Sequence, residues 1–349
     1  MNPISRDSAH LYPATEPEAA GDVDTEARRA LQAALWECKR VVVGQDAMLE
    51  RVLIALLCGG HVLLEGVPGL AKTLTVRTLA GVLGGSFGRV QFTPDLVPSD
   101  LVGTRIWQPS TGDFKTELGP VFANLLLADE INRAPAKVQS ALLEVMQEHQ
   151  VTIGGRAYAV PEPFLVLATQ NPIESEGTYA LPEAQVDRFL FKLVIDYPAL
   201  EDEVAVARGL VGVHSIVKEI LRPDDLLRYR TAARAVHVDR EIATYAVQLA
   251  TATRRPAESG LGELAPLIAF GASPRASIGL VESARALALL RGRTYVTAAD
   301  IHDLARDVLR HRLVLSYDAL ADGVSPDEIL DRVLEHVAPV GRVPLAEAS

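Results

Sequence analysis

The stretch EGVPGLAKTL, residues 65–74, follows the apolar run HVLL and precedes a segment whose apolar residues recur at helical spacing. A phosphate-binding loop between a strand and a helix has the spacing Gly, four residues, Gly, Lys and then Ser or Thr. Gly66, Lys72 and Thr73 fit this spacing, whereas Ala71 stands where the second glycine is usual. Alanine tolerates the left-handed backbone region poorly. The loop alone predicts a phosphate site and leaves an ordinary strand-to-helix turn open as the alternative.

Apolar runs of strand length alternate with helical patterns around this loop. After HVLLEG, they are RVQFT (89–93), NLLLADE (124–130), PFLVLATQN (163–171) and RFLFKLVI (188–195). Most of these runs are continuously apolar, as expected for strands that are covered on both faces. Strands that alternate with helices predict a parallel sheet between two helical layers. We therefore predict an α/β protein with a P-loop αβα core.

Two segments interrupt the alternation. The segment RIWQPSTGDFKTE (105–117) is polar and contains a turn, and VTIGGRAYAV (151–160) places two β-like runs around a Gly-Gly pair, which predicts a hairpin. Beyond residue 200, helix starts such as TAAD (297–300) and SPDE (325–328) recur instead of strands.

These patterns divide the chain into three parts. Residues 1–24 carry Pro, Glu and Asp without an apolar core, so we expect a disordered tail. Residues 25–200 form the predicted nucleotide-binding core, with insertions near 105–117 and 150–161. Residues 201–349 form an all-helical domain.

The composition limits the classes of function. The chain has 349 residues and a formal charge of −11, from 34 basic and 45 acidic side chains. Because an acidic surface repels a phosphate backbone, nucleic-acid binding is disfavoured. Cys38 and Cys58 lie in apolar helical patterns and indicate buried free thiols in a reducing cytoplasm. The longest apolar stretch is interrupted by Gly, His and Glu, which argues against membrane insertion. We therefore expect a cytoplasmic protein.

Polar residues end two of the predicted strands. Asp129 and Glu130 follow LLLA, and Asn171 ends the run that contains ATQN. One carboxylate can hold the shell of a Mg²⁺ ion while the other polarises a water molecule. The amide of Asn171 can hold that water or a phosphate oxygen. The alternatives are a solvated acidic strand end and a turn cap before Pro172.

Two arginines and one loop complete the candidate residues. Arg188 stands just before a strand in PEAQVDRF, and Arg275 begins a helical pattern in GASPRA. An arginine that reaches across a subunit contact can stabilise charge on a transferring phosphoryl group. The alternative for each is a surface salt bridge. The loop VVVGQD (41–46) can form an adenine pocket, or its apolar residues can simply pack into the hydrophobic core.

In this order, the motifs resemble those of AAA+ ATPases, and several strings closely resemble the MoxR family. The resemblance extends from about residue 25 to residue 340, and its strings are GVPGLAKT, FTPDLVPSDLVG, LLLADEINRAPAKVQSALLEVMQE, ATQNPIESEGTYALPEAQVDRF and SPRAS. It accounts for Ala71, because MoxR-like loops commonly carry alanine there. It implies a five-stranded parallel core and a helical lid. It also equates segments 105–117 and 151–160 with the helix-2 insertion and the pre-sensor-1 hairpin.

The resemblance also implies roles for individual residues. The implied catalytic residues are Glu130 as the base, Asn171 as the first sensor, Arg188 as the arginine finger of a neighbouring subunit and Arg275 as the second sensor. The implied ligands of ATP are Val43, Gly44, Gln45, Gly66, Pro68, Gly69, Leu70, Ala71, Lys72, Thr73 and Leu74, and those of Mg²⁺ are Thr73 and Asp129. Two points stay open: whether Arg275 acts on its own subunit or a neighbour, and whether Arg133 is a further trans-acting arginine.

The function implied by the resemblance is that of an ATP-hydrolysing chaperone. Such proteins generally form hexameric rings and remodel or activate protein partners, often partners with von Willebrand A domains. Trp107, Phe114 and Tyr158 are candidates for contacting a partner, with packing against their own domain as the alternative. Three rival functions are a nucleotide-gated scaffold with little hydrolysis, a DNA-translocating motor and the motor subunit of a metal chelatase. The acidic pair and Asn171 disfavour the scaffold, because they are suited to hydrolysis. The net charge disfavours the DNA motor, and the MoxR-like strings disfavour the chelatase subunit.

Overall fold

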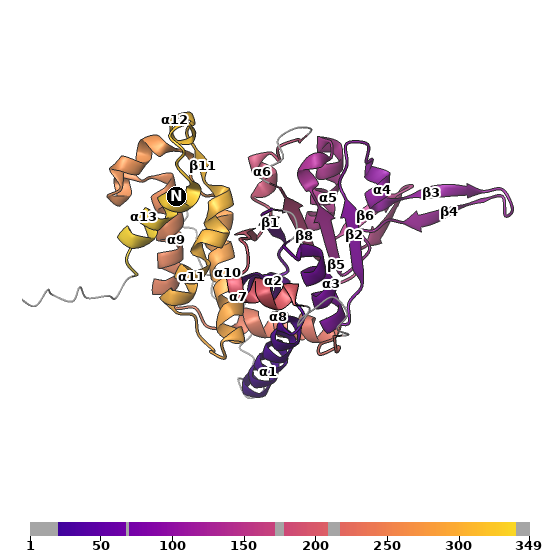
Figure 1. Cartoon of the computed structure of the whole chain (residues 1–349), viewed down its shortest axis with the longest axis horizontal. Coiled ribbons are helices and arrows are strands. Elements are labelled where there is room, and N and C mark those ends of the chain that lie inside the picture. Colours follow the sequence, from indigo (N-terminus) through magenta and orange to yellow (C-terminus); the bar gives the residue numbers. More distant parts are fainter. Residues whose placement is uncertain (1–19, 68–69, 172–177, 209–216, 340–349) are drawn as a thin grey trace, which may run out of the picture.

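A five-stranded parallel sheet lies at the centre of the nucleotide-binding core (Figure 1). The computed structural model describes residues 20–67, 70–171, 178–208 and 217–339. The strand order is β2-β5-β8-β1-β9, and all four strand pairs are parallel. The strands are β1 (Val62–Glu65), β2 (Phe87–Gln91), β5 (Leu125–Asp129), β8 (Leu165–Gln170) and β9 (Phe191–Val194). The predicted parallel sheet and its five strands are confirmed.

Both faces of the sheet are covered, which explains why the strands are continuously apolar. Leu125 and Leu127 of β5 belong to one hydrophobic cluster, and Leu126 and Ala128 belong to the other. The first cluster includes helices α1 (Ala20–Lys39), α2 (Asp46–Cys58) and α3 (Lys72–Val82), and the second includes α4 (Pro98–Val102) and α5 (Ala136–Glu148). The predicted αβα layering is confirmed.

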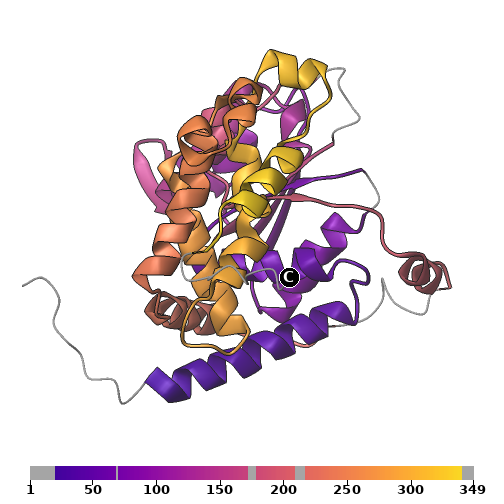
Figure 2. The same ribbon diagram turned by 90° about the vertical axis from the view of Figure 1, so that its left-hand side faces the viewer.

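Helix α1 begins earlier than predicted. It starts at Ala20, inside the segment predicted to be a disordered tail, so that prediction is wrong for residues 20–24. Helix α1 buries one stripe of residues at helical spacing, Ala27, Leu31, Ala34 and Cys38, and it forms the long helix at the bottom of Figure 2. The rest of the predicted tail, residues 1–19, lies outside the described residues.

Both insertions are antiparallel hairpins. Strands β3 (Gly103–Gln108) and β4 (Asp113–Leu118) project away from the sheet in Figure 1, and β6 (Gln150–Ile153) pairs with β7 (Arg156–Ala159). A contact of 3.1 Å between Thr116 Oγ1 and the Tyr158 hydroxyl joins the two hairpins. Trp107 and Phe114 contact each other at a ring-centroid distance of 5.1 Å and remain half exposed. The hairpin predicted at 151–160 is confirmed.

The carboxyl-terminal part is helical, as predicted, with one exception. Short 3₁₀ turns lie between some of its helices, and α6 (Glu183–Val186) belongs to the core instead. The helices of this part are α7 (Leu200–Ala207), α8 (Pro223–Ala235), α9 (Arg240–Arg254), α10 (Pro274–Leu290), α11 (Ala298–Leu309), α12 (Tyr317–Ala321) and α13 (Pro326–His336). Strands β10 (Ile268–Phe270) and β11 (Val314–Leu315) form a small antiparallel sheet, so "all-helical" is wrong in this detail. These strands have only three and two residues, so their apolar runs are shorter than those that predict the core strands. The helix starts predicted from TAAD and SPDE are confirmed, since α11 begins at Ala298 and α13 at Pro326, each preceded by a capping box.

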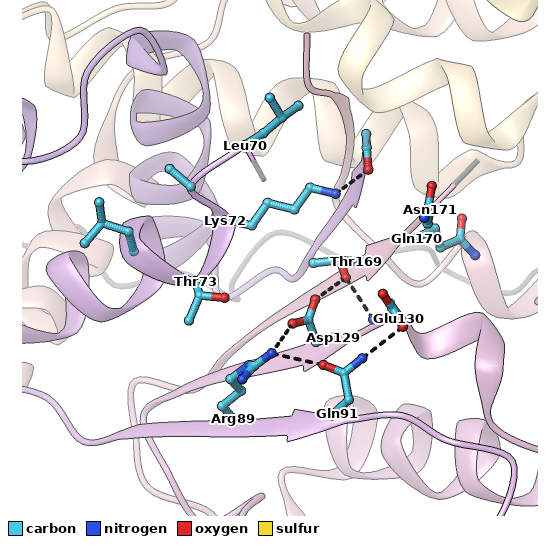
Figure 3. A pocket seen from close by; sticks show the side chains of 13 residues that line it. Leu70, Lys72, Thr73, Arg89, Gln91, Asp129, Glu130, Thr169, Gln170 and Asn171 are labelled. Carbon is cyan, nitrogen blue, oxygen red and sulfur yellow. Dashed lines mark hydrogen bonds and ion pairs between the residues drawn. The ribbon is translucent and has the colours of Figure 1, made fainter. Parts of the chain in front are cut away.

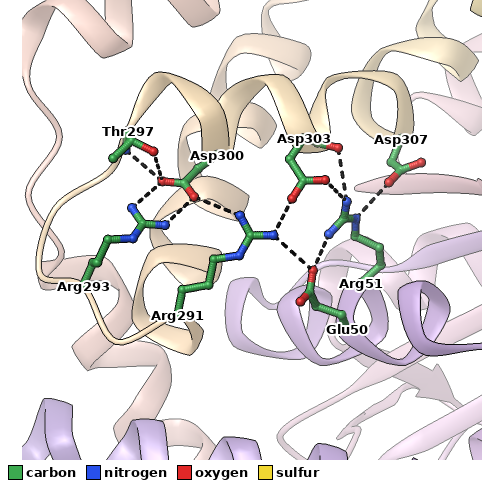
Figure 4. A network of polar contacts seen from close by, with 8 residues as sticks. All are labelled: Glu50, Arg51, Arg291, Arg293, Thr297, Asp300, Asp303 and Asp307. Atoms are coloured by element: carbon green, nitrogen blue, oxygen red, sulfur yellow. Dashed lines mark hydrogen bonds and ion pairs between the residues drawn. The ribbon is translucent and has the colours of Figure 1, made fainter.

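The helical part shares its core with the sheet. One hydrophobic cluster contains residues of β1, α2, α8 and α10 together. A polar network, shown in Figure 4, adds charged contacts between α2 and α11. Arg51 lies 2.7 Å from Asp303 Oδ1 and 2.9 Å from Asp307 Oδ2, and its side chain is 9% exposed. Asp300 is buried and accepts hydrogen bonds from Arg293 and Thr297. The helices are therefore fastened to the core by apolar and ionic contacts.

None of the helices within the described ranges combines the length and the apolar character that crossing a bilayer requires.

We predict that Asp300→Asn destabilises the protein by about 2 kcal/mol, because it weakens the charged hydrogen bonds to Arg293. The exposed pair of Arg306 and Asp331, 2.6 Å apart, offers a matched control. Asp331→Asn should cost less than about 1 kcal/mol, since exposed ion pairs contribute little. Urea unfolding of the two variants and the wild type measures both differences.

The Asp300 carboxyl should also show a pH signature. Burial alone would raise the pKa of Asp300, but the hydrogen bonds from Arg293 and Thr297 hold it below its ordinary value. A carboxyl with a lowered pKa stabilises the fold above the unfolded pKa, and this stabilisation is lost as pH falls through the folded pKa. The stability difference between wild type and Asp300→Asn should therefore be constant near neutral pH and shrink below about pH 4. A constant difference down to about pH 3 would contradict this ion pair.

Candidate functional site

A cavity of about 430 Å³ lies at the carboxyl edge of the sheet, where β1, β5 and β8 end (Figure 3). It brings together nine of the predicted residues: Gly66, Leu70, Ala71, Lys72, Thr73, Leu74, Asp129, Glu130 and Asn171. Arg89, Gln91, Thr169 and Gln170 also line it, and the sequence analysis did not predict them. Pro68 and Gly69, two further predicted ligands, lie outside the described residues.

The loop between β1 and α3 has the backbone that the motif requires. A side-chain carbon added at Gly66 would lie 2.7 Å from the carbonyl oxygen of Ile195, so only glycine fits there. Ala71 caps the amino end of α3 with φ 55°, in the left-handed region. An alanine in this region is strained, and such strain is commonly held at binding sites. Helix α3 thus begins at Lys72, with its amino end at the cavity.

Lys72 supplies a cation inside this loop. Its Nζ donates a hydrogen bond to the Gly66 carbonyl oxygen at 2.5 Å. Burial lowers the pKa of Lys72, while the nearby carboxylates of Asp129 and Glu130 oppose that shift. An ammonium group beside a helix amino end is suited to hold phosphate oxygens.

Asp129 is the last residue of β5, and both of its carboxylate oxygens have partners. The Thr169 hydroxyl donates to Asp129 Oδ1 at 2.8 Å, and Arg89 Nη2 lies 2.8 Å from Asp129 Oδ2. The Thr169 hydroxyl oxygen also accepts the backbone N–H of Glu130 at 2.8 Å. Thr169 therefore fixes both acidic residues from the neighbouring strand.

Glu130 follows β5 in the left-handed region, with φ 57°. Gln91 Nε2 donates to Glu130 Oε2 at 2.9 Å, and Arg133 Nε lies 3.0 Å from the same oxygen. Gln91 lies opposite Asp129 in the strand register, which places its side chain at the same edge. Asn171 follows β8 and has a buried side chain. The acidic pair and the amide thus surround the space next to Lys72.

The residues of this cavity fit Mg²⁺ bound together with a nucleotide. The hydroxyl of Thr73 and the carboxylate of Asp129 are oxygen donors, which Mg²⁺ prefers. In the parts of the chain that the structure describes, no group of three or more His, Cys, Asp or Glu side chains could hold a metal ion unaided. Phosphate and water oxygens would therefore have to complete the coordination, which is how Mg²⁺ usually binds with nucleotides.

Arg188 and Arg275 lie in a different cavity, of about 200 Å³, together with His61, Met146 and Gln147. His61 directly precedes β1, whereas Gly66 directly follows it, so the two cavities lie at opposite ends of this strand. The structure therefore does not bring Arg188 or Arg275 to the phosphate loop of their own subunit.

Asp187 holds Arg275 in this second cavity. Arg275 Nη1 lies 3.3 Å from Asp187 Oδ2, and Ser273 and Arg312 bind the same carboxylate. Arg188 makes a hydrogen bond of 3.4 Å to the Leu143 carbonyl oxygen, and within the described residues it has no carboxylate partner. Among the described residues, Arg188 therefore lacks the surface salt bridge that was the alternative for it.

The segment Val43, Gly44 and Gln45 lies between α1 and α2, against the residues that follow β9. Gln45 Nε2 donates to the Asp196 carbonyl oxygen at 3.3 Å, and a side-chain carbon at Gly44 would meet Pro198 at 2.7 Å. This segment does not line the cavity that holds Lys72. Its assignment to the adenine side remains a prediction.

Comparisons with known proteins agree with this geometry. Residues 61–191 match the model of the ATPase family associated with various cellular activities (AAA), and residues 264–333 match the AAA lid domain. The chain is 57% identical over 308 residues to chaperone MoxR1 of Mycobacterium tuberculosis, covering 88% of this chain and 82% of that protein. It is 37% identical to protein MoxR of Paracoccus denitrificans, covering 79% of this chain and 86% of the relative.

A solved structure of a Cytophaga hutchinsonii protein has the same fold, with a TM-score of 0.87 and 48% sequence identity. The alignment covers 92% of this chain and 98% of the solved one.

We predict that Thr169→Val lowers nucleoside triphosphate hydrolysis by about 10- to 100-fold, because valine keeps the shape but removes the hydroxyl that positions Asp129 and Glu130. Thr169→Ser keeps the hydroxyl and should restore most of the activity. A phosphate-release assay measures both variants, and their melting temperatures show whether the fold is intact. Equal activities of the two variants would contradict the positioning role of the hydroxyl.

Proposed function

The chain belongs to the MoxR family of AAA ATPases, and we propose that it hydrolyses ATP with Mg²⁺ in the cavity at Lys72 and acts as a chaperone. The observation that carries this proposal is the convergence of Lys72, Thr73, Asp129 and Glu130 on one cavity at the amino end of a helix. The identity of 57% to chaperone MoxR1 supports the chaperone activity.

Each side chain of the cavity has a task in this reaction. Lys72 and the amino end of α3 bind the β- and γ-phosphates. Thr73 and Asp129 hold Mg²⁺, which when bound offsets the charge of the phosphate oxygens. Glu130 accepts a proton from the attacking water, and Asn171 orients that water. Gln91 and Arg133 both contact Oε2 of Glu130, so the other carboxylate oxygen, Oε1, is the one that accepts the proton.

We infer that Arg188 and Arg275 act on the nucleotide of a neighbouring subunit. The two arginines lie together at the opposite end of β1 from the phosphate loop. They can therefore complete a site only when a second copy places its loop against them. A contact of this kind joins two different surfaces of the same chain, and it closes into a ring when the rotation allows. This supports the hexameric ring that the family resemblance implies.

The client of this chaperone is proposed to be a protein with a von Willebrand A domain, as the family resemblance implies. The β3–β4 hairpin is the part of the molecule best suited to contact it. Trp107 and Phe114 are 51% and 49% exposed there, and they contact each other rather than the core. The hairpin's extension away from the sheet is consistent with contact to another protein (Figure 1).

Two substitutions test the catalytic cavity. Glu130→Gln should keep ATP affinity within about threefold and lower turnover at least about 100-fold, because it removes the base but not the phosphate ligands. Lys72→Ala should weaken ATP binding itself, since it removes the cation of the loop. Calorimetry gives the affinities, and a steady-state phosphate-release assay gives the rates. Normal turnover by Glu130→Gln, or unchanged affinity of Lys72→Ala, would remove that residue from its assigned role.

Mixing two inactive variants tests the action in trans. Arg188→Ala keeps its phosphate loop but lacks the arginine, whereas Lys72→Ala lacks the loop cation but keeps the arginine. Each alone should hydrolyse little ATP, and a mixed assembly should regain part of the activity, because a Lys72→Ala subunit supplies Arg188 to its neighbour. Arg275→Ala mixed with Lys72→Ala should behave in the same way. A mixture that assembles but stays inactive would contradict the trans assignment for that arginine.

A further inference from the structure

Arg89 is the cation that faces Asp129 in the nucleotide cavity. Its Nη2 lies 2.8 Å from Asp129 Oδ2 and 3.0 Å from Gln91 Oε1 (Figure 3). Lys72, the cation of the loop, instead donates to the Gly66 carbonyl oxygen. In the part of the chain that the structure describes, the ion pair of Asp129 is therefore with Arg89 and not with Lys72.

Strand pairing produces this contact. Gln91 lies opposite Asp129 in the parallel register of β2 and β5. Arg89 stands two residues before Gln91, and side chains two residues apart in a strand project from the same face. Val90, between them, is buried on the other face, whereas Arg89 and Gln91 are open to the cavity. Arg89 is therefore directed at the acidic strand end by the sheet itself.

The contact occupies an oxygen that a metal site needs. Thr169 already donates to Asp129 Oδ1, and Arg89 pairs with Oδ2. A divalent cation held at this carboxylate would place a second positive charge beside the guanidinium. Like charges only a few ångströms apart repel strongly in a partly buried site. Arg89 and a cation bound at this carboxylate therefore disfavour each other.

Arg89 can leave its position without a large cost, whereas Asp129 cannot. The side chain of Arg89 is 47% exposed and that of Asp129 is 18% exposed. An ion pair with so exposed a partner is weak, and a departing guanidinium returns to water. Asp129 stays in place because it is the end of a buried strand and is held by Thr169.

We propose that Arg89 is a positioning residue that holds Asp129 until Mg²⁺ binds, and that Arg89 and Mg²⁺ compete for this carboxylate. The inference rests on the proposed function, since it requires the cavity to bind a nucleotide with Mg²⁺. Without metal, Arg89 neutralises a carboxylate that would otherwise repel the phosphates. With metal, Mg²⁺ takes over this neutralisation and Arg89 is released. Arg89 therefore lets the nucleotide enter first and raises the Mg²⁺ concentration needed to complete the site.

Arg89→Gln tests this proposal by equilibrium binding instead of turnover. A fluorescent, non-hydrolysable ATP analogue is titrated in EDTA and then across a series of Mg²⁺ concentrations. In EDTA, the variant should bind the analogue about two- to fivefold more weakly than the wild type, because Asp129 is no longer neutralised. Its Mg²⁺ midpoint should be about two- to fivefold lower, because no guanidinium competes with the metal.

Arg255→Gln is the matched control. Arg255 pairs with Glu258 at 3.2 Å in the helical part, and the two side chains are 66% and 70% exposed. Arg255→Gln should therefore change neither the affinity for the analogue in EDTA nor the Mg²⁺ midpoint. Arg89→Lys keeps the charge, and its Mg²⁺ midpoint should lie between those of the wild type and Arg89→Gln.

The outcomes separate this proposal from the proposed function. An unchanged or higher Mg²⁺ midpoint in Arg89→Gln would overturn the competition while leaving nucleotide binding established. Weaker analogue binding in EDTA together with a lower Mg²⁺ midpoint supports the competition, because a merely structural defect would not lower the midpoint. Failure of the wild type to bind the analogue even with Mg²⁺ would instead overturn the proposed function.

Discussion

The position of β5 between β2 and β8 is the constraint on which the site depends. In this parallel arrangement Gln91 lies opposite Asp129, and Ala128 lies opposite Ala168, which leaves Thr169 beside Asp129. A slip of one residue would turn the Asp129 side chain to the other face of the sheet. The register is specified by the apolar residues of β5 and β8, which are buried on both faces. Apolar residues that take no part in the reaction therefore decide whether Asp129 and Glu130 contact Thr169 and Gln91.

The sequence predicts the strands and the charged ends of this arrangement, but not the contacts between strands. Continuous apolar runs identify β1, β5 and β8. Asp129 and Glu130 stand out because they directly follow such a run, and Lys72 because of its spacing from Gly66 in the loop. Thr169, Arg89 and Gln91 carry no comparable signal, since isolated polar residues are common in strands. Their roles arise because β2 and β8 flank β5 in the sheet, and this order differs from the order along the chain. A single sequence contains the strands but not their lateral order.

Polar contacts join the helical part to the core at several places. Arg51 of α2 binds Asp303 and Asp307 of α11, and Asp187 of the core binds Ser273 and Arg312. A free swing of the lid would have to separate these pairs and open a continuous hydrophobic cluster. In the ring proposed above, a change at the nucleotide would therefore be transmitted more readily across the contact between subunits than by opening the helical part.

The charges in the second cavity bear on the contact between subunits that is proposed above. Asp187 binds Arg275, which places its guanidinium in the same cavity as that of Arg188, although like charges repel. His61 adds no further charge: burial lowers its pKa to about 4, its Nε2 bonds to the Met146 carbonyl oxygen and its Nδ1 accepts the N–H of Val166. Within the described residues, Asp187 balances Arg275, whereas Arg188 has only the Leu143 carbonyl oxygen. The charge left over in this cavity is positive, which suits an anionic ligand. In the assembly proposed above, a phosphate held by the Lys72 loop of a neighbouring copy would be this anion.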